Sequence, residues 1–429
     1  MNRKITLDEN EIPKKWYNIL PDLPKSLPPP KDPENGPSRI KNLPKIFSKG
    51  VLQQENAEER FIEIPTKVRE LYIQSGRPRP LYRAKHLEQK LNTPAKLYYK
   101  SEFYSPTGSH KVNTAIPQAY YAKKQGIERM TTETGAGQWG SALAYACTLL
   151  KMKLTVYWVK AASEWKPERR SYMKLCGANV FDSPSNNTKV GRELLKTNPN
   201  HQGSLGIAIA EAIQDAVNDT NAVYSLGSVL NHVLLHQTII GLECKKQMKK
   251  IDEYPDLVIS CLGGGSNFGG IAIPFIRDKI KKKKEIKFIA SQSEVAPNLK
   301  GKYRYDYGDY AEQTPLIKMC TLGHKTFFQP IKADGLRYHA AAPIISALRK
   351  MGMIDTIIYP ADENYVFQRA KMFLQSEGFL PAPESAYSIA AAIDEAKKCK
   401  KTDDEKTILF NVSGHGFMDM EGYQEKLKL

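Results

Sequence analysis

A lysine at the start of a predicted helix is the first candidate for chemistry. Lys111 lies in the polar segment Ser105-Pro-Thr-Gly-Ser-His-Lys-Val-Asn-Thr114, after a Gly-Ser turn and before the helical pattern Val-Asn-Thr-Ala-Ile. The positive end of a helix dipole disfavours a charged amine, so a lysine here is electrostatically misplaced. Burial that keeps the amine neutral, or an imine linkage, removes this conflict. The alternative interpretation is an exposed lysine on a loop.

A run of glycines forms the second candidate. The segment Cys261-Leu-Gly-Gly-Gly-Ser-Asn-Phe-Gly-Gly270 follows the strand pattern of residues 257–260. Successive glycines let backbone N–H groups surround one anion, and the following helix adds its dipole and the donors Ser266 and Asn267. The segment lacks the Gly-Lys-Ser/Thr end of a Walker motif, and Phe268 breaks a dinucleotide fingerprint. It predicts a phosphate cradle, and a tight strand-to-helix turn without a ligand is the alternative.

The third candidate is a carboxylate beside a flexible loop. Glu133 lies in Thr132-Glu-Thr-Gly-Ala-Gly-Gln-Trp-Gly140, just ahead of an apolar helical run over residues 141–150. Backbone amides of residues 134–138 can bind a substrate carboxylate at that helix start. An acid beside such a group can move protons during catalysis. The alternative role for Glu133 is a helix-capping acid.

The elements that must position these segments follow an alternating pattern. From about residue 100 the chain repeats a short β-branched run, a turn and a helical pattern, which is typical of parallel strands joined by crossover helices. We predict strands over residues 154–159, 257–262, 287–291 and 407–412, and a helix over residues 167–175. The predicted fold class is α/β, with two domains of twisted parallel sheets flanked by helices.

The N-terminal region differs from the rest of the chain. The first 50 residues hold nine of the 27 prolines, including Pro28-Pro29-Pro30, which predicts an extended segment without regular helix or central strand. Apolar residues such as Trp16 and Tyr17 favour an arm docked on the protein over a flexible tail. We therefore predict an arm over residues 1–74 and a catalytic region over 75–429. The smaller domain would span about 110–230, and the ligand would lie between it and the larger domain.

Composition narrows the class of protein. The 429 residues are 41% hydrophobic and 25% charged, which suffices for a globular core and excludes a disordered polymer. The net charge of +17 would attract anions, but the lysine-rich run at residues 279–287 lacks interleaved aromatics and is better explained as a solvated helix end. We predict no nucleic-acid partner and no membrane span. Six dispersed cysteines, without a Cys-x-x-Cys pair, indicate reduced thiols and a cytoplasmic location.

Two histidines four residues apart also need an interpretation. His232 and His236 share one helical face, as metal ligands do, but apolar residues fill the gap between them. Core histidines or pocket-wall residues are favoured, and no metal site is predicted from this pair.

An anion cradle, an activated lysine and a carboxylate-binding loop together suit pyridoxal phosphate acting on an amino acid. The chain resembles the β-subunits of tryptophan synthase, a family of fold-type II pyridoxal-phosphate enzymes, over about residues 75–420. The resemblance rests on these motifs: Gly-Arg-Pro-Arg-Pro-Leu at 76–81, Gly-Ser-His-Lys-Val-Asn around Lys111, Glu-Thr-Gly-Ala-Gly-Gln at 133–138, Gly-Gly-Gly-Ser-Asn at 263–267, Glu-Gly-Phe-Leu-Pro-Ala at 377–382 and Val-Ser-Gly at 412–414.

This resemblance implies a role for each matching position. Lys111 would hold the cofactor as a Schiff base and shuttle the substrate α-proton, and Glu133 would assist loss of the serine hydroxyl and deprotonate indole. Ser413 would hydrogen-bond the pyridine nitrogen, and Glu377 would be an acid near the cofactor. The implied phosphate and cofactor contacts are His110, Gln138, Gly263, Gly264, Gly265, Ser266 and Asn267. The implied carboxylate site is Thr134, Gly135, Ala136, Gly137 and Gln138.

Departures from the common pattern indicate a subtype. Trp139 replaces a histidine, and Arg337 stands where the common enzymes carry an aspartate, which resembles the second type of β-subunit. Without that aspartate the preference for serine is open. Arg337 is a candidate substrate-binding residue for an anionic leaving group, which makes O-phosphoserine an alternative substrate, or else a structural ion-pair partner.

The activity implied by the resemblance is condensation of L-serine with indole to give L-tryptophan and water. The nearer alternatives are an O-phosphoserine-using synthase and a serine or threonine dehydratase on the same scaffold. The distant alternative is a phosphate-binding protein without catalysis. The family further implies a homodimer, a complex with an α-subunit, an indole tunnel and a monovalent cation, K⁺ or Na⁺, near the cofactor.

Overall fold

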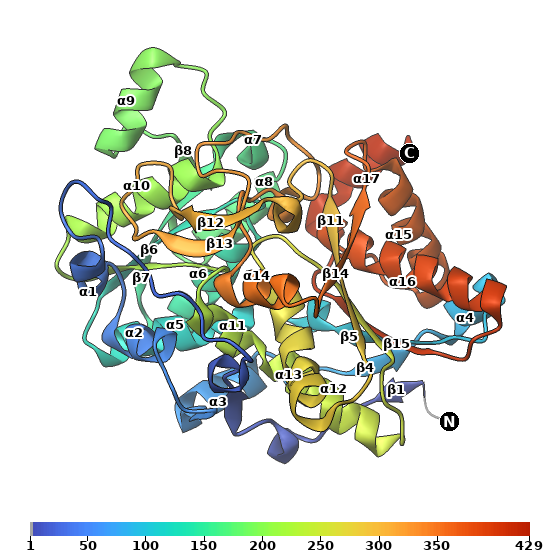
Figure 1. Cartoon of the computed structure of the whole chain (residues 1–429). Coiled ribbons are helices and arrows are strands. Elements are labelled where there is room, and N and C mark those ends of the chain that lie inside the picture. Colours follow the sequence, from blue (N-terminus) through green and yellow to red (C-terminus); the bar gives the residue numbers. More distant parts are fainter. Residues whose placement is uncertain (1–2) are drawn as a thin grey trace.

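The computed structural model describes residues 3–429, which form two main β-sheets covered by helices (Figure 1). The larger sheet has seven strands, and its central part is parallel while β1 and β4 pair antiparallel at one edge. Its strands, in spatial order, are β1 (Lys4–Ile5), β4 (Leu81–Arg83), β5 (Lys96–Ser101), β15 (Thr407–Val412), β10 (Leu257–Cys261), β11 (Lys287–Ser293) and β14 (Asp355–Tyr359).

The smaller sheet is entirely parallel. Its strands, in spatial order, are β8 (Asn179–Ser183), β7 (Lys153–Val159), β6 (Arg129–Thr134) and β9 (Ala222–Ser225). Two antiparallel ribbons complete the described strands: β2 (Lys15–Tyr17) with β3 (Phe61–Glu63), and β12 (Lys302–Asp306) with β13 (Ile317–Thr321). The predicted α/β class with parallel sheets is confirmed.

Helices cover the sheets. They are α1 (Leu43–Ile46), α2 (Lys49–Glu55), α3 (Thr66–Gln74), α4 (Lys85–Leu91), α5 (Val112–Lys124), α6 (Gln138–Leu150), α7 (Lys160–Ser163), α8 (Pro167–Leu175), α9 (Lys189–Thr197), α10 (Leu205–Val217), α11 (Asn231–Gln237), α12 (Ile239–Lys250), α13 (Ser266–Lys282), α14 (Pro343–Lys350), α15 (Asn364–Glu377), α16 (Pro383–Thr402) and α17 (Met420–Leu427). Across residues 3–429, none is both long and apolar enough to span a bilayer. Three of the long helices, α5, α6 and α13, begin at the three candidate segments.

Side-chain alternation along β10 shows why the larger sheet is buried on both faces. Val258 belongs to one core cluster together with Phe268 of α13, whereas Leu257 and Ile259 belong to a second cluster together with Ile389 of α16. Successive residues of a strand point to opposite faces, so a parallel strand between two helix layers must be apolar throughout. The predicted strands at 154–159, 257–262, 287–291 and 407–412 are confirmed as β7, β10, β11 and β15, and the predicted helix at 167–175 is α8.

The N-terminal region lies against the rest of the protein. Trp16 and Tyr17 are fully buried, and the backbone N–H of Tyr17 donates to Thr238 Oγ1 at 3.1 Å. The expectation that the first 50 residues contain no regular helix is wrong, since α1 begins at Leu43 and α2 at Lys49. Pro44 is accommodated in the first turn of α1, where a helix does not use the missing backbone N–H.

Beneath the N-terminus of α5 lies a group of buried charges. Glu102 accepts from Arg77 Nη2 at 2.6 Å and from Arg79 Nη1 at 2.5 Å, while Glu243 pairs with Arg77 and with Lys100. All five side chains are inaccessible to solvent. Burial would raise the pKa of Glu102, but the two arginines outweigh it and hold the pKa well below the usual range.

This charge group is tied to the helix that starts at the candidate lysine. The Asn113 side chain, two residues after Lys111, donates to Glu102 Oε2 at 3.0 Å and accepts from Arg77 Nε at 3.0 Å. The buried charges therefore fix the first turn of α5 from below.

We expect Glu102→Gln to lower the free energy of unfolding by about 3–5 kcal/mol, because it leaves two buried arginines without their shared carboxylate. Urea denaturation measures the change. The control is Glu70→Gln, which removes an exposed carboxylate paired with Lys67 and should cost less than about 1 kcal/mol. Equal effects from the two variants would contradict a structural role for the buried group.

Candidate active site

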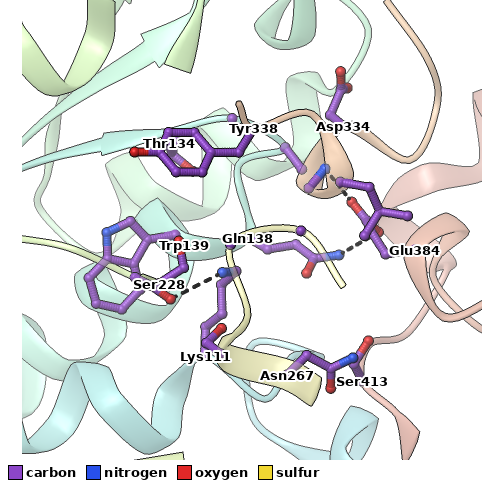
Figure 2. Close-up of a pocket in the computed structure, with 18 of the residues that line it drawn as sticks. Lys111, Thr134, Gln138, Trp139, Ser228, Asn267, Asp334, Tyr338, Glu384 and Ser413 are labelled. Carbon is purple, nitrogen blue, oxygen red and sulfur yellow. Dashed lines mark hydrogen bonds between the residues drawn. The ribbon is translucent and has the colours of Figure 1, made fainter. Parts of the chain in front are cut away.

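One pocket gathers most of the predicted site residues (Figure 2). It encloses about 730 Å³, part of it open to solvent, where β6 and β10 end and α5, α6 and α13 begin. Ligands of parallel α/β folds bind at such carboxyl edges because loops and helix N-termini converge there. The predicted residues that line the pocket are His110, Lys111, Glu133, Thr134, Gly135, Ala136, Gln138, Gly263, Gly264, Gly265, Ser266, Asn267 and Ser413.

Lys111 caps the N-terminus of α5 and reaches into the pocket, where its Nζ donates to the Gly227 carbonyl at 3.5 Å. Removal from water lowers the pKa of Lys111, and Glu133 and Glu384 offset part of that shift. A lowered pKa leaves a larger fraction of the amine unprotonated near neutral pH, and only the unprotonated amine is a nucleophile. Lys111 therefore does lie at a helix N-terminus, as the sequence predicted, and the lowered pKa reduces the electrostatic conflict with the helix dipole.

The glycine run forms a tight cradle next to Lys111. A Cβ on Gly263 would lie 2.3 Å from the Gly335 carbonyl oxygen, and one on Gly264 would lie 2.5 Å from Ser228 Oγ. Gly265 precedes α13 with a φ of +116°, which side-chain-bearing residues rarely adopt. Only glycine suits these positions, and the backbone N–H groups at the start of α13 are left facing the pocket.

His110 and Ser266 sit beside the cradle. His110 Nε2 lies 3.3 Å from Ser266 Oγ, and burial lowers the pKa of His110 to about 3 with a smaller effect from Lys111. The ring is therefore neutral. Its Nδ1 atom is buried and has no hydrogen-bond partner within residues 3–429.

Backbone pairing brings the segment after β15 to this place. His110 N–H donates to the Ser413 carbonyl at 2.9 Å, and His415 N–H donates to the Gly108 carbonyl at 2.8 Å. The Ser413 hydroxyl lies 2.9 Å from that of Ser385. An uncharged hydroxyl thus faces the pocket more than 300 residues after Lys111 in the sequence.

The loop before α6 forms another part of the pocket wall. Gly137 has a φ of +83° and a Cβ there would lie 2.6 Å from Trp158, so this predicted residue does not line the pocket but allows the turn into the helix. The Gln138 amide donates to Glu384 Oε2 at 3.2 Å, and both residues are labelled in Figure 2. Gly335 N–H donates to Glu384 Oε1 at 2.9 Å.

Glu133 is the second-to-last residue of β6 and is buried at the pocket wall. The Tyr224 hydroxyl donates to Glu133 Oε2 at 2.6 Å. Burial raises the pKa of Glu133 to about 8, although Tyr224 and Lys111 act in the opposite direction. A carboxyl group with this pKa can both give and accept a proton near neutral pH.

Besides Gly137, two further predicted residues lie outside the pocket. Glu377 accepts from the backbone N–H of Leu87 at 2.9 Å and pairs with Arg3, because it ends α15 on the side of that helix facing α4. Arg337 donates to Asp334 Oδ1 at 2.7 Å and lines an adjoining depression. Its geometry is that of an ion-pair partner.

Other pocket residues were not among the predicted site residues. They are Trp139, Leu205, Gly227, Ser228, Cys261, Asp334, Gly335, Leu336, Tyr338 and Glu384. Glu384 carried a local signal, since it follows Pro383 in the first turn of α16 as helix-starting acids do. Burial raises its pKa. Asp334 carried none, because only the fold brings it to the pocket.

The histidine pair has partners that explain it without a metal. His232 Nδ1 lies 2.7 Å from Glu55 Oε2, and His236 Nε2 lies 2.7 Å from Gln54 Oε1. Both rings are buried, as expected for core histidines. Over the described part of the chain there is no group of three or more His, Cys, Asp or Glu side chains arranged to hold a metal ion.

Comparisons with known proteins show the family of this chain. The family model described as pyridoxal-phosphate dependent enzyme matches residues 73–414. The tryptophan synthase beta chain 2 of Methanothermobacter thermautotrophicus is 54% identical over 429 residues, covering 100% of this chain and 99% of that protein. The beta chain 2 of Methanosarcina mazei is 52% identical over 424 residues, covering 98% and 95%.

A solved structure shares the fold at low sequence identity. A fungal L-serine ammonia-lyase from Rhizomucor miehei superimposes with a TM-score of 0.60 at 15% identity, covering 82% of this chain and 97% of that one. The family match and the near-complete coverage of the relatives settle membership: this chain belongs to the pyridoxal-phosphate-dependent enzymes and, within them, to the tryptophan synthase β-chain family.

Proposed function

We propose that this protein joins L-serine and indole to form L-tryptophan and water. The observation that carries the proposal is the convergence of Lys111, the glycine cradle and the buried Glu133 in one pocket of a chain from this family. Each group answers a separate need of the reaction. An amine must take the α-proton, an anion site must hold the cofactor, and an acid must release the hydroxyl.

The pocket fits pyridoxal phosphate, the cofactor of this family. When bound, this cofactor supplies an electron sink that stabilises negative charge at the amino-acid α-carbon. The backbone at Gly263 to Gly265 leaves room for a phosphate where a Cβ would intrude, with Ser266 and His110 beside it. The unpartnered Nδ1 of His110 is consistent with a polar ligand at this place. We propose that Lys111 holds the cofactor and Ser413 its ring nitrogen.

The other residues divide the remaining tasks. Backbone N–H groups of residues 134–138, at the start of α6, bind the serine carboxylate. Lys111 Nζ takes the α-proton, and the carboxyl of Glu133 gives a proton to the departing hydroxyl and later accepts one from indole. Because the pKa of Glu133 is raised to about 8, both of its protonation states are accessible at neutral pH.

The surroundings of Arg337 favour serine over O-phosphoserine. Its guanidinium is paired with Asp334, whose other oxygen lies 3.4 Å from Lys166 Nζ, and it does not line the main pocket. Of these groups, Asp334 is the one that lines the pocket. Because the guanidinium that would bind a phosphate leaving group is already paired and lies outside the pocket, we propose that serine is the substrate.

Larger-scale properties follow from family resemblance and from the arrangement of the chain. We propose a homodimer that binds a tryptophan synthase α-subunit, with a monovalent cation near the cofactor. The two sheets support the division into a smaller domain of about 110–230 and a larger domain, with the pocket between them. All six cysteines are free, which supports a cytoplasmic location.

We expect Lys111→Ala to abolish the violet absorbance of the cofactor imine and the formation of tryptophan. Borohydride reduction of the unmodified protein, followed by peptide mapping, should label the 105–114 segment. Lys124→Ala removes an exposed lysine from the other end of α5 and is the matched control, with full absorbance expected. A label on another lysine would refute the assignment.

We expect Glu133→Gln to keep the imine absorbance but lower kcat for tryptophan formation by about 10²-fold or more, since it removes the proton donor and acceptor. In the unmodified enzyme, the step that needs ionised Glu133 should speed up as the pH rises through about 8, and this limb should vanish in the variant. Glu128→Gln, an exposed acid just before the same strand, is the control.

We expect kcat/KM for serine to exceed that for O-phosphoserine by about tenfold or more, with tryptophan as product when indole is present. Steady-state kinetics with product analysis measures this. Arg337→Gln should leave the ratio of the two substrates nearly unchanged. A preference for O-phosphoserine that disappears in this variant would favour the alternative synthase, and pyruvate as the only product would favour a dehydratase.

A further inference from the structure

A second cavity adjoins the main pocket at Tyr338. It is largely apolar, and Tyr224 and Tyr338 contribute to its wall. Glu133 lines the main pocket but not this cavity, whereas Tyr338 lines both, and its ring is visible at the edge of the site in Figure 2. The Tyr224–Glu133 hydrogen bond of 2.6 Å therefore crosses the boundary between a polar and an apolar space.

The position of the Tyr224 hydroxyl is determined by rigid elements. Tyr224 belongs to β9, where it is the register partner of Thr131 on β6, two residues before Glu133 on the same face. Its ring packs against Phe47 with the two ring centres 5.6 Å apart. A side chain held by a strand and by ring packing directs its hydroxyl to one place.

We propose that Tyr224 is a positioning residue for Glu133: its hydroxyl holds the carboxylate in one orientation at the pocket and favours the ionised form. This inference rests on the proposed function, because it assigns Tyr224 through the proton transfers given to Glu133.

The charges around the pair support this assignment. Burial and the nearby Glu133 raise the pKa of Tyr224, so the phenol remains a proton donor. Among the groups that face Glu133, Lys111 favours its ionised form, while Tyr338 and Asp309 lie on the side of Tyr224. A hydrogen bond to an ionised, desolvated carboxylate is stronger than one to a neutral group. Loss of the hydroxyl must therefore raise the pKa of Glu133 further.

The test is Tyr224→Phe, which keeps the ring and removes only the donor. We expect the acid limb of kcat to move upward by about one pH unit, so that kcat near pH 7 falls about tenfold while kcat at high pH and KM for serine change little. A second readout does not depend on activity: infrared difference spectra should show the Glu133 carboxyl band, assigned with Glu133→Gln, titrating at higher pH in the variant.

Tyr157→Phe is the matched control. Tyr157 belongs to β7 on the same face of the same sheet, and its hydroxyl donates to Asp215 Oδ2 at 3.1 Å, outside the pocket. It should leave the pH profile and the infrared titration unchanged. Coincident profiles for the unmodified enzyme and Tyr224→Phe would overturn the inference.

The two proposals fail in different ways. If the unmodified protein makes no tryptophan, the proposed function fails, while the infrared titration still decides whether Tyr224 sets the ionisation of Glu133. If tryptophan forms normally and neither the pH limb nor the carboxyl band moves in Tyr224→Phe, the positioning role alone is refuted.

Discussion

An amine held at the N-terminus of a helix and withdrawn from water is the constraint on which this site depends. The helix dipole and the loss of hydration both disfavour the charged form of Lys111, so the surrounding structure must keep it in place. The Gly227 carbonyl contacts the amine, and the buried charges around Glu102 hold the first turn of α5 through Asn113. The buried charges thus stabilise the start of the helix at which Lys111 lies.

The same withdrawal from water separates the protonation behaviour of the neighbouring groups. Burial holds His110 neutral beside the glycine cradle, whereas it raises the pKa of Glu133 into the range where protons are exchanged near neutral pH. One pocket thus contains a neutral ring, a weakened base and a weakened acid. Pairs of titratable groups whose environments shift their pKa values in this way are suited to separate acid and base steps.

Local patterns carried much of the prediction. Continuous β-branched runs identified β7, β10, β11 and β15, since strands buried on both faces must be apolar throughout. Three successive glycines identified the cradle, because no other residue fits where a Cβ would meet Gly335 or Ser228. Local reasoning failed where partners are distant. Glu377 and Glu384 are close in sequence, yet the turn between α15 and α16 sends only the second to the pocket.

The sequence by itself indicated the fold class and singled out the lysine at the start of α5, the glycine run before α13 and the glutamate of β6, because each depends on residue type and on neighbours within one turn or strand. The tertiary structure decided which residues surround them. Tyr224 reaches Glu133 across 91 positions and Glu384 reaches Gln138 across 246, and these contacts exist only once the strands and helices have packed together. The tertiary structure also gave Arg337 its ion-pair partner, Asp334. Ionisation depends on burial and on partners, and both are properties of the assembled chain.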